Sequence, residues 1–367
     1  MQIRIIMLVD LDYFFAQCEE LRNPTLKNKP VVVCVFSGRS EDSGAVSTAN
    51  YIARKYGVKS GIPIFLAKKK LKNTDAVFLP VDHTFYEEIS DKIMQILRGY
   101  ADLFEQVGID EAYLDITKKA RGNFEEARDL AQKVKEEVKN QQKITCSIGI
   151  GPNKLVAKIA ADNQKPDGLT TIKPEEVKGF LFPLSVNRLI GVGRRIAEKM
   201  ETLRIKTIGD LAKYDAQRLV EVFGKKLGVY FHEAANGKDD SPVQEAGETE
   251  SISKISTLKE NTLDLELVLE KTNQLCEEIH RELAQRRLHF RQVEIIAVMA
   301  DMSIRSRSET LEKATNELET LKKIVNGLLE KFLNESNQEI RRVGVKISQF
   351  TKEQNGQKRL TSFFETN

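Results

Sequence analysis

The chain has 367 residues, enough for more than one hydrophobic core, and its 41% hydrophobic and 30% charged residues are typical of a soluble protein. Its net charge of +3 neither requires nor excludes a nucleic-acid partner. No Cys-x-x-Cys pair argues for zinc, and no apolar run of about eighteen residues indicates a membrane span, so we expect a cytoplasmic protein.

Residues 3–9 form the first predicted strand, because their apolar side chains are continuous and mostly branched. Asp10 and Asp12 follow at its carboxyl end, the usual place for a site in a mixed α/β sheet. Tyr13, Phe14 and Phe15 then lead into a helix predicted over 15–21. We expect Phe14 to fill the core. For Tyr13 and Phe15, which lie close to the acids, core packing and contact with a ligand fit about equally well.

Small side chains dominate residues 44–50. They allow a flat ligand or another backbone to approach closely. Thr48 or Asn50 can cap a helix that begins near Tyr51, and Tyr51 and Arg54 share one face of its first turns. A helix start beside a cation is an anion site, although an ordinary capped helix with a solvated arginine explains the same pattern. Strands over 29–36 and 76–80 and a helix over 64–71 complete this segment.

A second acidic pair, Asp110 and Glu111, interrupts a predicted hairpin. The elements here are a helix over 84–100, a hairpin over 103–107 and 112–116, a helix over 124–139 and a strand over 144–150. Their order matches a ferredoxin-like βαββαβ sheet, which brings Asp10 against the pair. Hard oxygen donors without His or Cys favour Mg²⁺ or Mn²⁺. Because adjacent residues of a regular strand face opposite sides, both acids reach one centre only if a bulge or turn lies there.

Lys165 follows a helix predicted over 154–161 and lies in a turn from which it can reach back over the carboxylates. Without a partner, a lysine in a turn lies in solvent, and that is the alternative for Lys165.

Short helices are predicted over 171–236, where twelve Lys and Arg outnumber eight Asp and Glu. Gly191 and Gly193 form a Gly-x-Gly turn there, and outward backbone N–H groups at such a turn can bind a DNA phosphate. The basic excess favours a helix-hairpin-helix over a plain αα-hairpin.

Residues 237–247 are polar and contain glycine and proline, which predicts an interdomain linker. A second βαββαβ unit is expected beyond it, with strands over 250–258, 292–299, 302–309 and 341–350 and helices over 263–286 and 311–332. Basic residues lie on or beside its strands: Arg291, Arg305, Arg307, Arg341, Arg342 and Lys346. One helix-covered face and one basic open face would fit a nucleic-acid backbone.

The polar tail contains Gln357, Leu360, Phe363 and Phe364. In a single helical turn these residues form an apolar knob suited to a partner's groove. The alternative is that the tail folds back on its own domain.

Four motifs together resemble the archaeal DinB-type members of the Y-family of translesion DNA polymerases, over nearly the whole chain. They are Val-Asp-Leu-Asp-Tyr-Phe-Phe-Ala-Gln at 9–17, Ser-Gly-Ala-Val-Ser-Thr-Ala-Asn-Tyr at 43–51 with Arg54, Ile-Asp-Glu-Ala-Tyr-Leu-Asp at 109–115, and the segment 153–168. Gly108 stands where a serine is common in the family's motif.

The resemblance implies a multidomain α+β right-hand polymerase. It divides the chain into a ferredoxin-like palm (1–21 and 79–170), a small fingers lobe (22–78), a helix-hairpin-helix thumb (171–236), a linker (237–247), a βαββαβ little finger that binds DNA (248–350) and a tail with a clamp-binding box (351–367). The implied activity is template-directed synthesis past damaged bases, with low fidelity and no proofreading exonuclease.

The resemblance also implies roles for individual residues. Asp10, Asp110 and Glu111 would be catalytic and, with the carbonyl of Leu11, would hold two Mg²⁺ ions or Mn²⁺ as a substitute. The nucleotide would be contacted by Tyr13, Phe14, Phe15, Ala45, Ser47, Thr48, Tyr51, Arg54 and Lys165, with Phe15 as the steric gate against ribonucleotides. Gly191, Gly193, Arg305, Arg307, Arg341 and Arg342 would bind primer–template DNA, and Gln357, Leu360, Phe363 and Phe364 would bind the PCNA sliding clamp. We expect a monomer that acts without a membrane.

Two other classes of protein fit part of the sequence. A nucleotide cyclase also combines a ferredoxin-like palm with paired carboxylates and two metals, but it needs neither the helix-hairpin-helix, the second basic sheet nor the clamp box. A non-catalytic DNA-bridging protein would keep those three features and would not need the acids. All three acids are present, which favours the polymerase.

Overall fold

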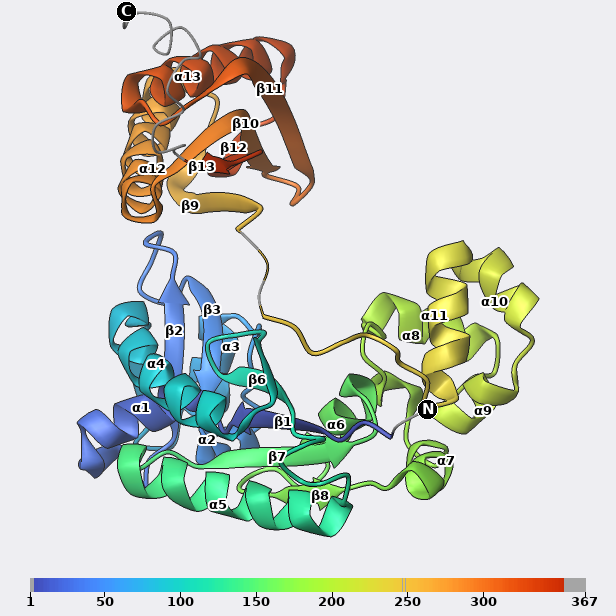
Figure 1. Ribbon diagram of the computed structural model, residues 1–367. Coiled ribbons are helices and arrows are strands. Elements are labelled where there is room, and N and C mark those ends of the chain that lie inside the picture. The colour runs from blue at the N-terminus through green and yellow to red at the C-terminus, as the bar shows by residue number, and fades with distance from the viewer. Residues whose placement is uncertain (1–2, 246, 248, 353–367) are drawn as a thin grey trace, which may run out of the picture. The chain divides into compact units, whose positions relative to one another are not determined.

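The computed structural model of the protein describes residues 3–245, 247 and 249–352 (Figure 1). These residues divide into two compact units. The first holds nearly all the residues before 246, and the second holds those after it together with Phe36–Ala45 and Pro63–Phe65. Within this described part, every helix is too short or too polar to cross a membrane.

A five-stranded sheet forms the centre of the first unit (Figure 1). Its middle strand is β1 (Ile6–Leu11), which pairs antiparallel with β6 (Glu111–Asp115) on one side and β7 (Cys146–Gly151) on the other. The edges are β5 (Leu103–Gln106) and β8 (Leu169–Thr171). The ferredoxin-like order expected for the first four strands is confirmed, and β8, parallel to β7, is an addition that the sequence did not predict.

Helices cover both faces of this sheet, which explains why all six residues of β1 are buried. Three helices, α1 (Phe14–Arg22), α4 (His83–Tyr100) and α5 (Phe124–Gln142), contribute to the core with Met7 and Val9. The short helix α6 (Lys154–Ala161) packs on the opposite face, against Ile6 and Leu8.

The inserted lobe contains a three-stranded sheet in the order β3-β2-β4. Its elements are η1 (Pro24–Leu26), β2 (Val31–Phe36), β3 (Gly44–Ala49), α2 (Tyr51–Lys55), α3 (Ile64–Lys70) and β4 (Val77–Pro80). The run of small residues is therefore a strand. Asn50, not Thr48, caps α2, because the Asn50 side chain accepts a hydrogen bond from the Ala53 N–H at 3.0 Å.

Short helices follow the sheet. They are η2 (Pro174–Glu176), α7 (Val177–Leu181), η3 (Val186–Arg188), α8 (Arg194–Thr202), α9 (Ile208–Lys213), α10 (Ala216–Phe223) and α11 (Lys225–Ala235), packed around a core that includes Met200, Leu219 and Phe231. The expected Gly-x-Gly turn joins the single-turn 3₁₀ helix η3 to α8, so the element before the turn is shorter than an α-helix.

The segment predicted as an interdomain linker makes contacts within the first unit as far as residue 245. Arg4 donates to the carbonyl oxygens of Asp239 and Ser241 at 2.8 and 2.9 Å, and Asn153 donates to the Gly237 carbonyl at 2.8 Å. Val243 is 3% exposed and packs beside α6. The segment predicted as an interdomain linker is therefore docked on the first unit by hydrogen bonds and one buried valine.

The second unit has a sheet in the order β11-β10-β12-β9 with two helices on one face. Its elements are β9 (Ser251–Thr262), α12 (Leu265–Arg286), β10 (Leu288–Met299), β11 (Ile304–Thr315), α13 (Leu318–Glu335), β12 (Ile340–Ser348) and the short β13 (Thr351–Lys352). The expected βαββαβ order is present. The helix predicted from residue 311 is wrong at its start, since β11 continues to Thr315 by pairing with β10.

Gly149→Ala should lower the free energy of unfolding by about 1–3 kcal/mol. An added Cβ at this β7 position would lie 2.0 Å from the Ala157 carbonyl oxygen and 2.2 Å from the Ala161 nitrogen, both in α6. Denaturant unfolding measures the change. Gly179→Ala in α7 is the matched control, because its Cβ meets nothing within 4 Å and should be neutral or slightly stabilising. Wild-type stability of Gly149→Ala would contradict the close approach of α6 to β7.

Candidate active site

Asp10, Asp110 and Glu111 come from neighbouring strands of the central sheet. Asp10 of β1 lies directly opposite Glu111, the first residue of β6. Asp110 precedes Glu111 in a bend, and its carbonyl oxygen accepts the Leu11 N–H at 2.8 Å. The Gly108 N–H donates to the Glu111 carbonyl at 3.2 Å, which closes a tight turn. The structure therefore has the irregular backbone that two adjacent acids need in order to serve one centre.

Lys158 of α6 lies between two of these acids. Its Nζ is 3.0 Å from Asp10 Oδ2 and 2.8 Å from Glu111 Oε1. The helix reaches this position because Gly149 of β7 lacks a side chain and lets the α6 backbone rest directly on the strand. Asn153 starts α6 at the right point by accepting the Val156 N–H at 2.9 Å.

Lys165 brings a second ammonium group to the same carboxylate. Its Nζ is 2.7 Å from Asp10 Oδ2 and 3.0 Å from Asp162 Oδ1. Its side chain is 24% exposed, so the structure places this turn lysine over the acids and not in open solvent.

Burial dominates the electrostatics of the centre. It raises the pKa of Asp110 and of Glu111, and the neighbouring Asp10 carboxylate raises both further. Burial alone would lower the pKa of Lys158 and of Lys165, but the carboxylates around them outweigh it and raise both. The acids are therefore costly as free anions, and the two lysines stay charged to compensate them.

The donor chemistry of this centre fits a hard divalent cation. Buried carboxylate oxygens of like charge, without His or Cys beside them, are the ligand type of Mg²⁺ or Mn²⁺. Among residues 3–245, 247 and 249–352, however, no three acidic, His or Cys side chains already form a compact metal-ligand group. The ammonium groups of Lys158 and Lys165 lie among the acids in this arrangement.

Tyr13, Tyr51 and Arg54 form a connected group beside the acids. The rings of Tyr13 and Tyr51 meet edge to face with centroids 5.3 Å apart, and the Arg54 guanidinium lies 4.8 Å from the Tyr51 centroid. Burial, followed by the Asp12 carboxylate, raises the pKa of Tyr51, so the ring is an electrostatic neighbour of the acidic strand end. Tyr13 has a left-handed backbone with φ +37°, a strained conformation that residues with a Cβ adopt mainly where structure demands it.

Phe14 and Phe15 point to different surroundings. Phe14 is 1% exposed and belongs to the core, so the implied nucleotide contact is wrong for its side chain. The Phe15 ring is only partly buried; it stacks on Tyr86 at 4.5 Å and meets His83 edge to face at 5.9 Å. The surrounding rings hold the Phe15 ring in one orientation.

Ala45, Ser47 and Thr48 all lie on β3. Ala45 is also paired with Pro63 in an isolated bridge. Arg54, on α2 after this strand, donates from Nε to the Ala49 carbonyl at 2.8 Å, which fixes the guanidinium at the strand end.

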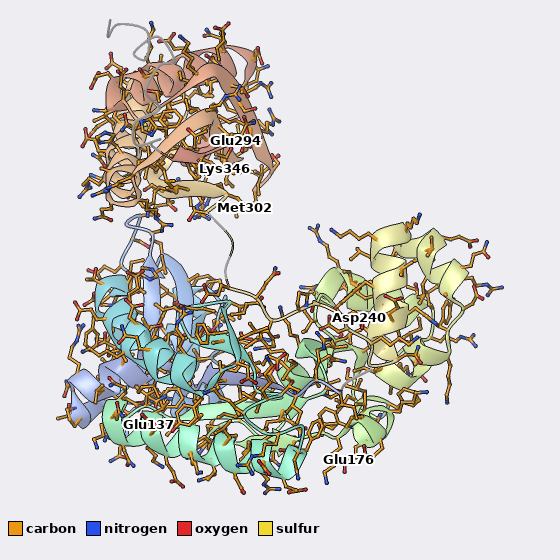
Figure 2. All side chains as sticks on the ribbon, viewed as in Figure 1. Glu137, Glu176, Asp240, Glu294, Met302 and Lys346 are labelled. Carbon is orange, nitrogen blue, oxygen red and sulfur yellow. The ribbon has the colours of Figure 1, made fainter. Side chains whose placement is uncertain are left out.

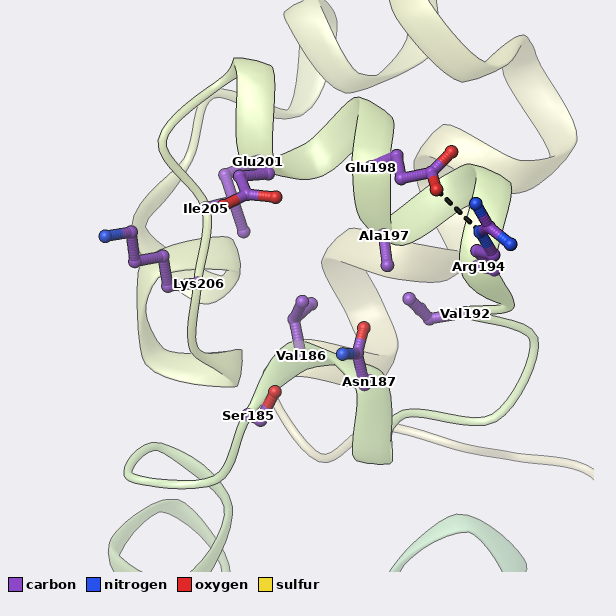
Figure 3. Close-up of a pocket in the computed structure, with 10 residues that line it drawn as sticks. All are labelled: Ser185, Val186, Asn187, Val192, Arg194, Ala197, Glu198, Glu201, Ile205 and Lys206. Atoms are coloured by element: carbon purple, nitrogen blue, oxygen red, sulfur yellow. Dashed lines mark hydrogen bonds and ion pairs between the residues drawn. The ribbon is translucent and has the colours of Figure 1, made fainter. Parts of the chain in front are cut away.

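Gly191 and Gly193 differ in what their positions require. Gly191 has φ +84°, which strains any residue with a Cβ, whereas Gly193 is the extended N-cap of α8. Figure 3 shows the cleft that α8 borders, with Arg194 paired to Glu198 at 2.8 Å on its rim. None of the residues lining this cleft belongs to the acidic centre.

The basic residues of the second sheet do not share one face. Arg305 and Arg307 lie opposite Ala297 and Ile295, which are buried under the helices, so their side chains project to the helix-covered side. Arg307 accordingly pairs with Glu335 of α13 at 3.0 Å. The expected basic open face is therefore wrong for these two residues, because the β10–β11 register fixes their direction.

Lys346 and Arg342 occupy the other face. Lys346 lies opposite Glu294 and pairs with it at 3.3 Å. Both residues are labelled in Figure 2. Arg342 lies opposite Val298 in the same register. Arg341 falls at the register shift between Ile340 and Arg342. The open face thus carries a mixed set of charged, hydroxyl and apolar side chains.

Sequence reasoning missed Lys158 as a member of the centre, and it gave no role to Asp12 or Lys135. No local pattern marks Lys158, because its reach to the acids depends on how closely α6 approaches Gly149. The predicted clamp-binding residues Gln357, Leu360, Phe363 and Phe364 lie outside the described residues.

Comparison with known proteins gives consistent matches. The impB/mucB/samB family model matches residues 9–162, its C-terminal domain model matches 249–360, and the DNA polymerase-iota thumb domain model matches 187–239. DNA polymerase IV of Nitrosopumilus maritimus is 47% identical over 365 residues, covering 99% of this chain and all of the relative. That of Methanosarcina acetivorans is 45% identical, with 99% of both chains covered.

Solved structures agree with these relatives. A Y-family DNA polymerase chimera, Dbh-Dpo4(243-245)-Dbh, matches with a TM-score of 0.88 at 37% identity, covering 95% of this chain and 99% of the other. The insertion ternary complex of Dbh DNA polymerase matches with a TM-score of 0.69 at the same identity and coverage.

Lys158→Met should lower the melting temperature measured without divalent ions, because Asp10 and Glu111 lose a buried cationic partner worth about 1–3 kcal/mol. Added Mg²⁺ or Mn²⁺ should restore stability to this variant more than it stabilises the wild type. Lys154→Met is the matched control on the same helix, since Lys154 pairs with Glu105 at 2.7 Å, away from the acids. An identical response of both variants to the ions would contradict the arrangement.

Proposed function

The chain belongs to the Y-family DNA polymerase IV (DinB) family and is a DNA-directed DNA polymerase. We propose that its acidic centre carries out two-metal-ion nucleotidyl transfer. The fold class expected from the sequence, with palm, fingers, thumb and little finger, is confirmed by the same matches. The observation that carries the proposal is the gathering of Asp10, Glu111 and two lysine ammonium groups at the end of β1. Membership of this family also sets aside the cyclase and the non-catalytic bridging protein.

Asp10, Asp110, Glu111 and the carbonyl of Leu11 would hold two Mg²⁺ ions, for which Mn²⁺ can substitute. Bound there, the ions supply Lewis-acid activation of the primer 3′-hydroxyl and stabilise the charge that develops on the leaving pyrophosphate. The chain's own part is to orient the carboxylates, through the β1–β6 register and the turn before Glu111. Lys158 and Lys165 compensate the carboxylates in this structure, and bound ions would supply that positive charge instead.

Tyr51, Arg54, Thr48 and Lys165 would bind the triphosphate. Arg54 and Lys165 bring positive charge, and the Tyr51 ring holds the guanidinium in place. Tyr13 would lie against the sugar, with Phe15 excluding a 2′-hydroxyl. Ala45 and Ser47, both small and on β3, would cover the base pair loosely, so that discrimination depends mostly on pairing and errors are frequent.

Primer–template DNA would be bound by the thumb and the little finger. Backbone N–H groups at Gly191 and Gly193 suit a phosphate, and Arg341 and Arg342 lie on a strand of the little-finger sheet. Arg305 and Arg307 would reach DNA only from the edge strand β11, because their side chains leave the open face. We assign no proofreading exonuclease, and the low fidelity follows from the loose cover over the base pair.

Asp110→Ala should reduce primer extension with Mg²⁺ and dNTPs by about 100-fold or more, because it removes a proposed bridging ligand. The measurement is single-nucleotide incorporation on undamaged and lesion-bearing templates. Glu125→Ala, which changes an exposed acid at the start of α5, is the control and should leave extension unchanged. Extension that survives in Asp110→Ala would remove the site assignment.

Phe15→Ala should raise ribonucleotide incorporation relative to deoxyribonucleotides by about 100-fold, since the ring fills the space of a 2′-hydroxyl. The ratio of kcat/KM for rNTP and dNTP measures it. Phe85→Ala serves as the control, because Phe85 packs on the same Tyr86 at 5.9 Å and should leave sugar selectivity intact. Unchanged selectivity in Phe15→Ala would place the gate elsewhere.

The tail residues Gln357, Leu360, Phe363 and Phe364 would tether the polymerase to the PCNA sliding clamp. Deleting residues 357–367 should abolish stimulation of primer extension by the clamp while leaving basal synthesis intact. Glu365→Ala is the control within the tail. Equal stimulation of the truncated protein would refute the tether.

A further inference from the structure

Asp12 is a buried carboxylate whose partners are all uncharged. Its side chain is 1% exposed. It accepts hydrogen bonds from Ser147 Oγ at 2.7 Å, from Thr145 Oγ1 at 3.0 Å and from the Asp167 backbone N–H at 2.9 Å. A buried carboxylate needs such donors. Two of them lie in or just before β7, and the third lies about twenty residues later, in the turn after α6.

The backbone of Asp12 is fixed as firmly as its side chain. Its N–H donates to the Thr145 carbonyl at 3.1 Å, and its carbonyl accepts from Gln17 Nε2 at 2.7 Å. The Gln17 side chain in turn accepts the Thr145 N–H at 2.6 Å. The end of β1, the start of α1 and the approach to β7 therefore hold the carboxylate rigidly.

The turn that Asp12 binds is held from its other side by Lys135 of α5. Lys135 Nζ donates to Asp167 Oδ1 and to the Cys146 carbonyl, both at 2.6 Å, and to the Gly168 carbonyl at 3.2 Å. The Lys135 side chain is only 11% exposed. The Gly168 N–H also donates to Ser147 Oγ at 3.3 Å. The turn thus has anchors at two consecutive residues, 167 and 168.

Lys165 lies two residues before these anchors, and its Nζ reaches Asp10 at 2.7 Å. We infer that Asp12 is a positioning residue that fixes the 164–168 turn and thereby aims Lys165 at the reacting phosphates. The inference rests on the proposed role of Lys165 in triphosphate binding. Asp12 would act on Lys165 through the turn, to which it is joined directly by the Asp167 N–H and indirectly by Ser147.

An acceptor-only group is required at this position. The three neighbours of Asp12 are two hydroxyls and one backbone N–H, and an ionised carboxylate can accept from all of them at once. An asparagine would set its own NH₂ group against one donor. Asp12→Asn should therefore have a weaker form of the defect that Asp12→Ala has.

Steady-state incorporation by the full-length protein tests the inference. In Asp12→Ala, the KM for dNTP should rise about tenfold, as in Lys165→Ala, while kcat changes by less than about threefold. The double variant Asp12→Ala/Lys165→Ala should be no worse than Lys165→Ala alone, because both changes remove the same contact. Effects that multiply in the double variant, or an unchanged KM in Asp12→Ala, would overturn it.

Two further variants separate positioning from loss of folding. Ser147→Ala removes one hydroxyl between Asp12 and the turn, so it should raise KM two- to fivefold and also be non-additive with Lys165→Ala. Tyr100→Phe breaks the hydrogen bond to Glu137 of α5, labelled in Figure 2, and should lower thermal stability without changing KM. A KM increase of the same size in Tyr100→Phe would show that general destabilisation explains the effect.

Hydrogen exchange gives a readout that does not depend on activity. The Asp167 amide should exchange much faster in Asp12→Ala than in the wild type, because its N–H loses its acceptor. The Gly168 amide should also exchange faster, because the Ser147 hydroxyl that accepts its N–H is no longer held by Asp12. Unchanged exchange would overturn the inference. If the wild-type protein incorporates no nucleotide, the proposed function fails, and this exchange experiment still decides whether Asp12 holds the turn.

Discussion

Asp10 Oδ2 lies 2.7 Å from the Lys165 ammonium and 3.0 Å from that of Lys158, so one carboxylate oxygen is shared by two cations. The charge is concentrated here because β1 is buried on both faces and its acid emerges only at the strand's end. Burial, followed by repulsion from the Asp10 carboxylate, raises the pKa of Asp110 and of Glu111 in this partly buried corner. Cations must be supplied from neighbouring elements. The placement of α6 and of the turn after it follows from that requirement.

Two kinds of buried acid stand two residues apart, and they are stabilised differently. Asp10 is compensated by charge, which a metal ion can exchange for its own. Asp12 is compensated by two hydroxyl donors and one backbone donor. A carboxylate that must change partners needs mobile lysine side chains around it, whereas one that holds a turn needs fixed donors. The end of β1 therefore carries two acids of different kinds: Asp10, whose lysine partners a metal ion could replace, and Asp12, whose hydrogen bonds hold the neighbouring turn.

The sequence predicts the parts of this centre that depend on local pattern. Asp10 is placed by the apolar run before it, and Asp110 by the hairpin around it, so their meeting follows from sheet topology alone. Lys158 could not be placed in this way, because its reach depends on how closely α6 approaches Gly149, a contact between separate elements. The direction of Arg307 depends on the β10–β11 register, which includes a shift that no pattern of residues announces. Packing between separate elements and strand register are therefore what the sequence could not predict for these residues, whereas local secondary structure could be predicted.

The two βαββαβ units show how the same order of elements leads to different sheets. In the first, β1 is fully buried and lies in the middle, so its carboxyl end is surrounded by β6, β7 and α6. In the second, β9 is mostly polar, with Ile252, Ile255 and Leu258 as its apolar residues, and it lies at the edge, with β12 between it and β10. A central strand end is enclosed by neighbours that can each bring a charged group, whereas an edge strand has a partner on one side only. That difference explains why Asp10, Asp110 and Glu111 gather with two lysines in the first sheet, while the second sheet has no such enclosed strand end among its described residues.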